Sequence, residues 1–132
     1  MCLTAFPNGV DTSVVRDGVR KTAAYTVVAN TESGKTFYID SGAVTFTLPA
    51  IADGQVFTFV NMNPDGAAAL TISPNANDGI QYKGSKTDDK DLINTAATAK
   101  KGDYVKVAAI ELSATSGAWS VTDVSGVWAK EA

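Results

Sequence analysis

Alternation between apolar and polar residues over positions 35–61 constrains the fold of this chain more than any other feature. Three short runs stand out in this stretch, at residues 37–39, 44–48 and 56–60, and Gly, Pro and Asp residues separate them. Side chains of a strand point alternately to the two faces of its sheet, so each run can bury every second residue. We therefore predict three strands here, and the turns between them predict antiparallel neighbours.

Similar segments recur to the end of the chain, with turn residues at a spacing of about ten residues. Asn63-Pro64-Asp65-Gly66 and Thr115-Ser116-Gly117 are predicted hairpin turns. Residues 23–132 are thus predicted to form one all-β domain, a two-sheet antiparallel β-sandwich of the jelly-roll or Greek-key kind. Besides the three strands above, we expect strands at residues 24–29, 69–73, 80–82, 104–112, 118–124 and 127–128.

The composition limits the partners that such a domain can have. The net charge is −3 and the lysines and arginines are dispersed, which argues against binding to nucleic acid. No apolar run approaches the roughly 18 residues that a membrane-spanning helix needs. The N-terminus has no basic segment followed by an apolar core, so we expect synthesis in the cytoplasm without a signal peptide.

Residues 1–22 differ from the rest, because their apolar residues follow no clear period. Phe6-Pro7-Asn8-Gly9 is a turn signal, and the residues after it mix valines with charged side chains. We predict an extended N-terminal arm, which a neighbouring chain can order more easily than its own small domain can. The arm residues expected to contact that neighbour are Leu3, Phe6, Pro7, Asn8, Val10, Val14 and Val15.

Residues 83–94 form the longest polar stretch, and we predict a loop with charges of both signs. Its apolar pair Leu92-Ile93 is also suited to return to the core. The loop is the second expected contact region, through Lys86, Asp88, Asp89 and Leu92.

Clustered aspartates in and near this loop raise the question of a calcium site. Asp88, Asp89 and Asp91 are close in sequence, with Asp78 upstream, and calcium prefers carboxylate and carbonyl oxygens. The segment lacks the central glycine and the closing glutamate of an EF-hand loop, and two lysines are interleaved with the aspartates. We therefore favour a solvated loop or an intersubunit contact, and predict no metal site.

Residues that most enzyme mechanisms use are scarce. The chain has no histidine, and Cys2 is its only cysteine, so His-dependent triads and cysteine metal sites are excluded. Asp40, Asp53 and Asp65 each precede Gly or Ser in a turn signal, which favours a turn role over paired catalytic carboxylates. We predict a non-enzymatic protein without catalytic residues or a cofactor.

Aromatic residues could instead form a platform for sugars, but most of them lie inside alternating runs, where aromatics belong to the core. Trp128, close to the C-terminus, is the hardest to place in the core, and we predict it as a partner contact. The aromatic candidates are Phe37, Tyr38, Phe46, Phe57, Phe59, Tyr82, Tyr104, Trp119 and Trp128.

The stretch GKTFYIDSGAVTFTLPAIADGQVFTFVNMNPDGAAALTISPNANDGI resembles a β domain that recurs in virion proteins of tailed bacteriophages. The later segments KDLINTAATAKKGDYVKV, GAW-x-V and G-V-W look like the same family, and LTAFPNGV is similar to the N-terminal start of phage capsid-surface proteins. The family includes head decoration (cement) proteins, head fibres and tail-fibre modules. The chain contains no shaft or coiled-coil stalk, which favours a decoration protein.

This resemblance implies a structural protein on the capsid surface of the virion. It implies that the chain forms homotrimers and binds the major capsid protein, so that the shell is stabilised. The alternative is a receptor- or glycan-binding module of a phage fibre or spike.

Overall fold

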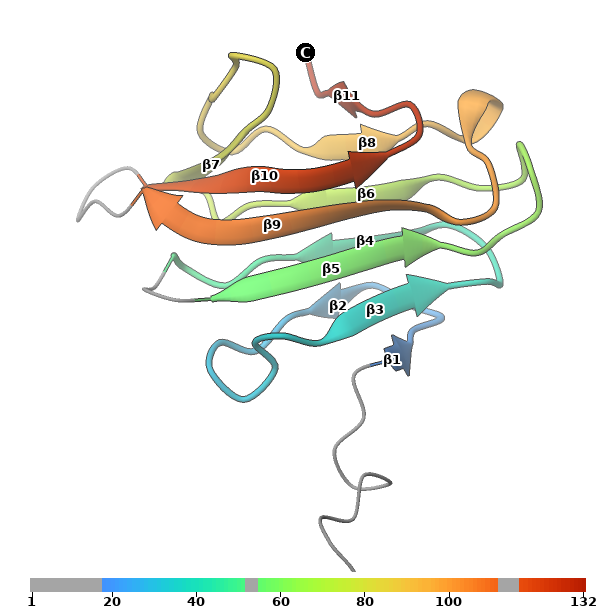
Figure 1. Ribbon diagram of the computed structural model, residues 1–132, viewed down its shortest axis with the longest axis horizontal. Helices are drawn as coiled ribbons and strands as arrows, with labels where there is room; N and C mark the ends of the chain where they lie inside the picture. The colour runs from blue at the N-terminus through green and yellow to red at the C-terminus, as the bar shows by residue number, and fades with distance from the viewer. Residues whose placement is uncertain (1–17, 52–54, 112–116) are drawn as a thin grey trace, which may run out of the picture.

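The computed structural model describes residues 18–51, 55–111 and 117–132, and the side chain of residue 111 lies outside this description. Within these residues the chain forms eleven strands and one short 3-10 helix, arranged as two facing sheets (Figure 1). The elements are β1 Gly18–Arg20, β2 Tyr25–Thr26, β3 Thr36–Ile39, β4 Val44–Thr47, β5 Val56–Asn61, β6 Leu70–Ser73, β7 Asp78–Gln81, β8 Leu92–Asn94, η1 Ala96–Thr98, β9 Asp103–Glu111, β10 Gly117–Ser125 and β11 Ala129–Lys130. Sheet A has the order β1-β3-β5-β9-β10-β7, and sheet B has the order β11-β8-β6-β4-β2.

The first six strands wind between the two sheets in the manner of a coil. β1, β3 and β5 are parallel neighbours in sheet A, and β2, β4 and β6 are parallel neighbours in sheet B. The all-β, two-sheet prediction is confirmed, but the antiparallel pairing predicted for residues 37–39, 44–48 and 56–60 is wrong. Every second residue is buried whichever way the neighbouring strand runs, so alternation cannot report strand direction.

The turn at residues 63–66 shows the same difference. The predicted hairpin is wrong there, because β5 and β6 lie in different sheets and do not pair. Gly66 has φ of 71° and turns the chain sharply, but it directs the chain across to the opposite sheet.

Antiparallel pairing dominates the second half of the chain. β9 lies between β5 and β10 and is antiparallel to both, and β8 is antiparallel to β6 and β11. The predicted hairpin between the two longest strands is therefore confirmed, although residues 112–116 of its connection lie outside the described residues. The last predicted strand, 127–128, is displaced by two residues to β11.

The core lies between the sheets and is rich in aromatic rings. Phe37 and Phe59 of sheet A meet Phe46 of sheet B, with ring centroids 5.0 to 5.7 Å apart. Phe57 packs against Trp119 at 5.6 Å, and all five side chains are fully buried. Such rings bury large apolar areas, so the alternating stretch supplies much of the stabilisation of the sandwich.

The domain begins earlier than the predicted boundary at residue 23. β1 pairs in parallel with β3, Val19 packs against the core, and Arg20 forms an ion pair of 2.6 Å with Asp40. These residues belong to the predicted arm, so the arm prediction is wrong for residues 18–20, which pair within their own chain. The arm contacts predicted from Leu3 to Val15 lie outside the described residues.

Candidate functional site

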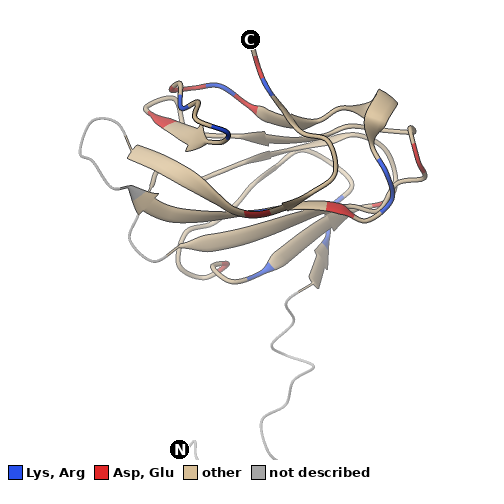
Figure 2. Ribbon diagram, turned by 45° about the horizontal axis from the view of Figure 1, so that its top comes forward, with Lys and Arg blue, Asp and Glu red and all other residues tan. Residues whose placement is uncertain are grey.

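Charged residues occupy the segment between β7 and β8 and the C-terminus, and Figure 2 shows them in blue and red on the ribbon. Two regions of the described chain can therefore be compared as binding surfaces. One is the charged segment after β7, and the other is the outer face of sheet A.

The segment after β7 is an ordered β-hairpin, which we call the β7–β8 hairpin (residues 79–88). Tyr82 and Ser85 exchange two backbone hydrogen bonds of 3.0 Å each, and Gly79 pairs with Asp88. The two residues at its tip, Lys83 and Gly84, both have positive φ, at 49° and 79°, as a type I′ turn requires. The predicted loop thus has fixed geometry, which local pairing provides.

The predicted contact residues Lys86, Asp88 and Asp89 come together at this hairpin. Lys86 Nζ lies 3.6 Å from Asp88 Oδ1, and Asp88 and Asp89 are exposed. The backbone N–H of Asp89 donates to the Asp78 carbonyl at 3.0 Å. These charges are displayed on a fixed backbone, so a partner would meet them already arranged.

The C-terminal strand holds the base of the hairpin. Lys130 Nζ donates to the carbonyls of Ile80 and Lys90, at 3.0 Å each. Asp91 and Glu131 hydrogen-bond each other through backbone and side chain, at 2.8 and 3.1 Å. Burial lowers the pKa of Lys130, and the nearby carboxylates of Asp91 and Glu131 partly oppose that shift.

Leu92 and Trp128 lie in the core of this chain, so their predicted partner contacts are wrong. Leu92 is fully buried in β8, whose alternation turns Ile93 outward instead. Trp128 is 5% exposed, and its indole N–H donates to the Ser125 carbonyl at 2.9 Å. A short terminal segment can therefore close the end of a sandwich with a large side chain.

Buried polar residues next to the Val127-Trp128 segment, where β5 and β8 end and β9 begins, form a network that sequence reasoning missed. Asn61 Nδ2 donates to Asn94 Oδ1 at 2.8 Å, and Asn63 Nδ2 donates to Asn61 Oδ1 at 3.0 Å. Asn94 Nδ2 in turn donates to Asp103 Oδ2 at 3.1 Å, and that oxygen also accepts the Lys100 backbone N–H at 2.9 Å. The N-x-N spacing after an apolar strand was the available signal. The network joins the two sheets, so these polar side chains have a structural role.

The aspartates considered as calcium ligands do not converge on one point. Asp78 is buried, and its carboxylate accepts the backbone N–H groups of Ile51 at 3.0 Å and Gly117 at 3.3 Å. Asp78 therefore anchors two loops, which explains its burial. Among the residues that the structure describes, no group of three or more His, Cys, Asp or Glu could hold a metal ion.

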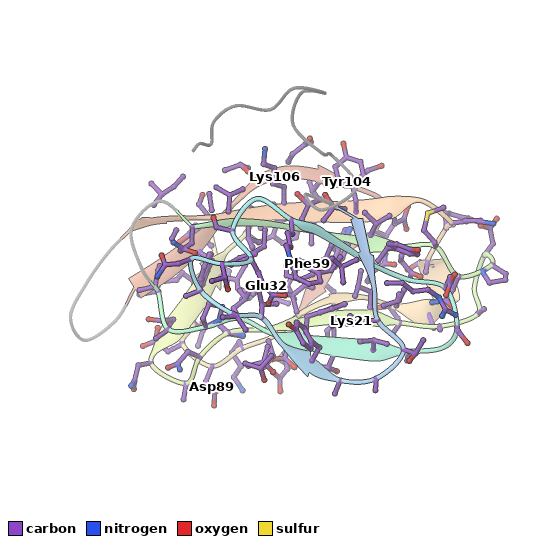
Figure 3. All side chains as sticks on the ribbon, turned by 90° about the horizontal axis from the view of Figure 1, so that it is seen from below. Lys21, Glu32, Phe59, Asp89, Tyr104 and Lys106 are labelled. Carbon is purple, nitrogen blue, oxygen red and sulfur yellow. The ribbon has the colours of Figure 1, made fainter. Side chains whose placement is uncertain are left out.

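The outer face of sheet A is the less expected surface. The strand register places Tyr38, Val60 and Tyr104 in one row across β3, β5 and β9. Figure 3 shows Tyr104 and Lys106 on the outside of the sheet, whereas Phe59 lies between the sheets. The signal in the sequence was a strand that is apolar on both faces, as in VFTFVN, where valines occupy the outward positions.

Of the aromatic residues considered for a sugar platform, only two tyrosines on this face are partly exposed. Tyr38 and Tyr104 are half-buried, and the Tyr104 hydroxyl lies 3.3 Å from both carboxylate oxygens of Asp123. The negative charge of Asp123 raises the pKa of Tyr104. The remaining candidates are buried in the core: Phe37, Phe46, Phe57, Phe59, Tyr82, Trp119 and Trp128.

No known family model, curated protein or solved structure matches the chain. Within the described residues, no helix is long and apolar enough to cross a membrane. Any assignment of function therefore depends on the surfaces above and on the resemblance of the sequence.

Proposed function

We propose that the chain is a non-enzymatic structural protein of a tailed-phage virion, a decoration protein that binds the major capsid protein on the outer surface of the shell. It acts as a homotrimer and stabilises the assembled capsid. The resemblance of residues 34–80 to the phage virion β domain supports this function, together with the positions of β1 and the β7–β8 hairpin at opposite edges of sheet A.

That placement is the observation that carries the proposal. β1, where the N-terminal segment joins the body, and β7, which continues into the β7–β8 hairpin, are the two opposite edges of sheet A (Figure 1). Five inter-strand steps separate them, which is about 24 Å at the usual strand spacing. Contacts at both edges would let one body bridge two neighbouring capsid subunits.

Mass action explains how such a bridge stabilises a shell. A ligand that binds the assembled form alone lowers its free energy by an amount that grows with ligand concentration over Kd. The second contact of a two-edge clamp is intramolecular once the first has formed, so its effective concentration is high. Separating two bridged subunits then requires breaking at least one of these contacts.

Deleting residues 1–15 tests the proposal. The truncated protein retains β1 and Val19, so we expect a wild-type circular dichroism spectrum and a Tm close to that of the full chain. We also expect that it no longer co-sediments with undecorated capsids. Normal shell occupancy by the truncated protein would refute the clamp.

A matched pair of single substitutions tests the hairpin edge. Asp89→Asn removes one charge from the β7–β8 hairpin while keeping a residue that tolerates the positive φ of 60°. Asp65→Asn makes the same change in an exposed turn at the opposite end of the sandwich, where the side-chain oxygen can still accept the Lys101 N–H. We expect weaker capsid binding for Asp89→Asn alone.

Location and copy number in purified virions separate the proposal from the fibre alternative. A decoration protein is expected on the head in many copies per particle, and gel densitometry against the major capsid protein measures this ratio. A few copies confined to the tail or collar would favour a receptor- or glycan-binding module.

A further inference from the structure

We propose that the outer face of sheet A is the surface through which copies of this chain pack against one another. This inference rests on the self-association contained in the proposed function and names its contact surface. The residues that define the face here are Tyr38, Val56, Val60, Tyr104, Lys106 and Ile110.

The first argument is the exposure of apolar side chains on this face. Ile110 is 64% exposed on β9. Val56 and Val60 are partly exposed on β5, next to β9. The row of Tyr38, Val60 and Tyr104 lies next to a polar row formed by Thr36, Thr58 and Lys106. A patch that combines tyrosines with exposed aliphatic side chains is typical of a protein interface.

The second argument compares the outward-pointing side chains of sheet A with those of sheet B in the same domain. The parallel register aligns Thr45 with Thr71, and Thr47 with Ser73, on its central strands β4 and β6. Hydroxyl groups keep their hydrogen bonds to water, so this face is suited to remain solvated. The central strands of sheet B thus turn only hydroxyl side chains outward, whereas β5 of sheet A turns Val56 and Val60 outward on either side of Thr58.

The third argument is size. Six strands span about 24 Å, and strands of six to nine residues extend about 20 to 30 Å, so the flat face covers about 500 to 700 Å². Side-chain relief increases the accessible area beyond this flat value. A stable interface buries about 800 Å² on each partner, so the face is large enough for a specific contact.

The fourth argument identifies the occupant as another copy of the same chain. Lys106 and Asp123 are cross-strand neighbours on β9 and β10, so each copy presents two adjacent charges of opposite sign on this face. A second copy presents the same pair, and in a closed assembly Lys106 of one copy can face Asp123 of the next. A highly charged partner such as nucleic acid would find no matching run of charge here.

Light scattering coupled to size-exclusion chromatography of the full chain tests this assignment. We expect a wild-type mass that is a multiple of the 13.7 kDa chain, and a monomer mass for Val60→Glu. Val60 points away from the core, so the variant should stay folded by circular dichroism. A buried unpaired carboxylate should weaken self-association by at least about a hundredfold.

Thr71→Glu is the matched control, because it places the same charge at an outward position of a central strand in sheet B. We expect it to leave the assembly intact. Dissociation by Thr71→Glu but not by Val60→Glu would overturn the face assignment while leaving the homotrimer in place. A wild-type protein that is monomeric at all concentrations would overturn both, and the capsid binding measured above would remain a separate result.

A charge swap provides a second test should Val60→Glu fail to fold. We expect Lys106→Asp to weaken self-association at least tenfold, and Lys106→Asp with Asp123→Lys to restore it. Both positions are exposed, so neither change enters the core. No weakening by the single change would overturn the pairing of these charges across the face.

Discussion

Among the glycines whose surroundings the structure describes, Gly126 is the one where an added methyl group should destabilise the protein most. It has φ of 97°, and a Cβ placed there would overlap the Asp103 carboxylate. Asp103 is 6% exposed, and it accepts hydrogen bonds from Asn94 Nδ2 at 3.1 Å and from the Lys100 N–H at 2.9 Å. In Gly126→Ala the carboxylate must move and lose these partners.

Two terms set the size of the effect. The left-handed backbone costs a non-glycine residue about 1 to 2 kcal/mol. Each hydrogen bond to a charged acceptor is worth about 1.5 to 3 kcal/mol, so losing both costs about 3 to 6 kcal/mol. The sum is about 4 to 8 kcal/mol, which is comparable to the whole stability of a small domain, about 5 to 15 kcal/mol.

Urea unfolding followed by circular dichroism measures this loss. Gly42→Ala is the control, since Gly42 has nearly the same φ of 100° but nothing within 4 Å of an added Cβ. We expect the control to lose about 1 to 2 kcal/mol, the backbone term alone. A Gly126→Ala protein no less stable than Gly42→Ala would refute the overlap with Asp103.

Three further changes have defined outcomes. Asn94→Ala should reduce the free energy of unfolding by about 2 to 4 kcal/mol in urea titrations, since it removes two hydrogen bonds of a buried network, one accepted from Asn61 and one donated to Asp103. Lys130→Met should detach the C-terminal strand, and the backbone amides of that strand should then exchange hydrogen faster. Burial lowers the pKa of Lys130 in the folded state, so the free energy of unfolding of the wild type should increase as pH rises from that pKa to 10.5. The variant should lack this increase. The Tyr25 hydroxyl donates a hydrogen bond to the Glu32 carboxylate, which raises the pKa of Tyr25 above 10.0. The stability that this hydrogen bond provides is therefore present below pH 10 and is lost as pH rises through the folded-state pKa. Glu32→Gln should lower that pKa, which an absorbance titration of Tyr25 measures.

The sequence predicted the burial pattern well because burial is a local property of alternation. Phe46 and Leu48 are buried where the pattern placed them, between threonines that face outward. Strand direction and sheet membership depend on where each turn sends the chain, and a turn such as 63–66 has the same residues in either topology. The coiled winding of β1 to β6 could therefore not be predicted from the sequence pattern.

The same distinction applies to the candidate site. Lys86 and Asp89 were identified because polar stretches between strands are exposed, and the structure shows them on the surface. Trp128 was misassigned because a short terminal strand has too few residues to show a period, although its indole closes the core. The apolar outer face of sheet A was visible only as valines at outward positions, which propensity for strands explains equally well.

The strand edges of this body leave the sheet faces as the surfaces for large contacts. β1, β2 and β11 have only two or three residues each, and Arg20, the last residue of β1, is paired with Asp40. The outer side of β7 is occupied by its own hairpin, through the pairing of Gly79 with Asp88. Short, charged or covered edges prevent strand addition, which would otherwise produce open-ended aggregates. Association through a face can close on itself, whereas repeated edge addition produces open chains, so these edges favour assemblies of defined size.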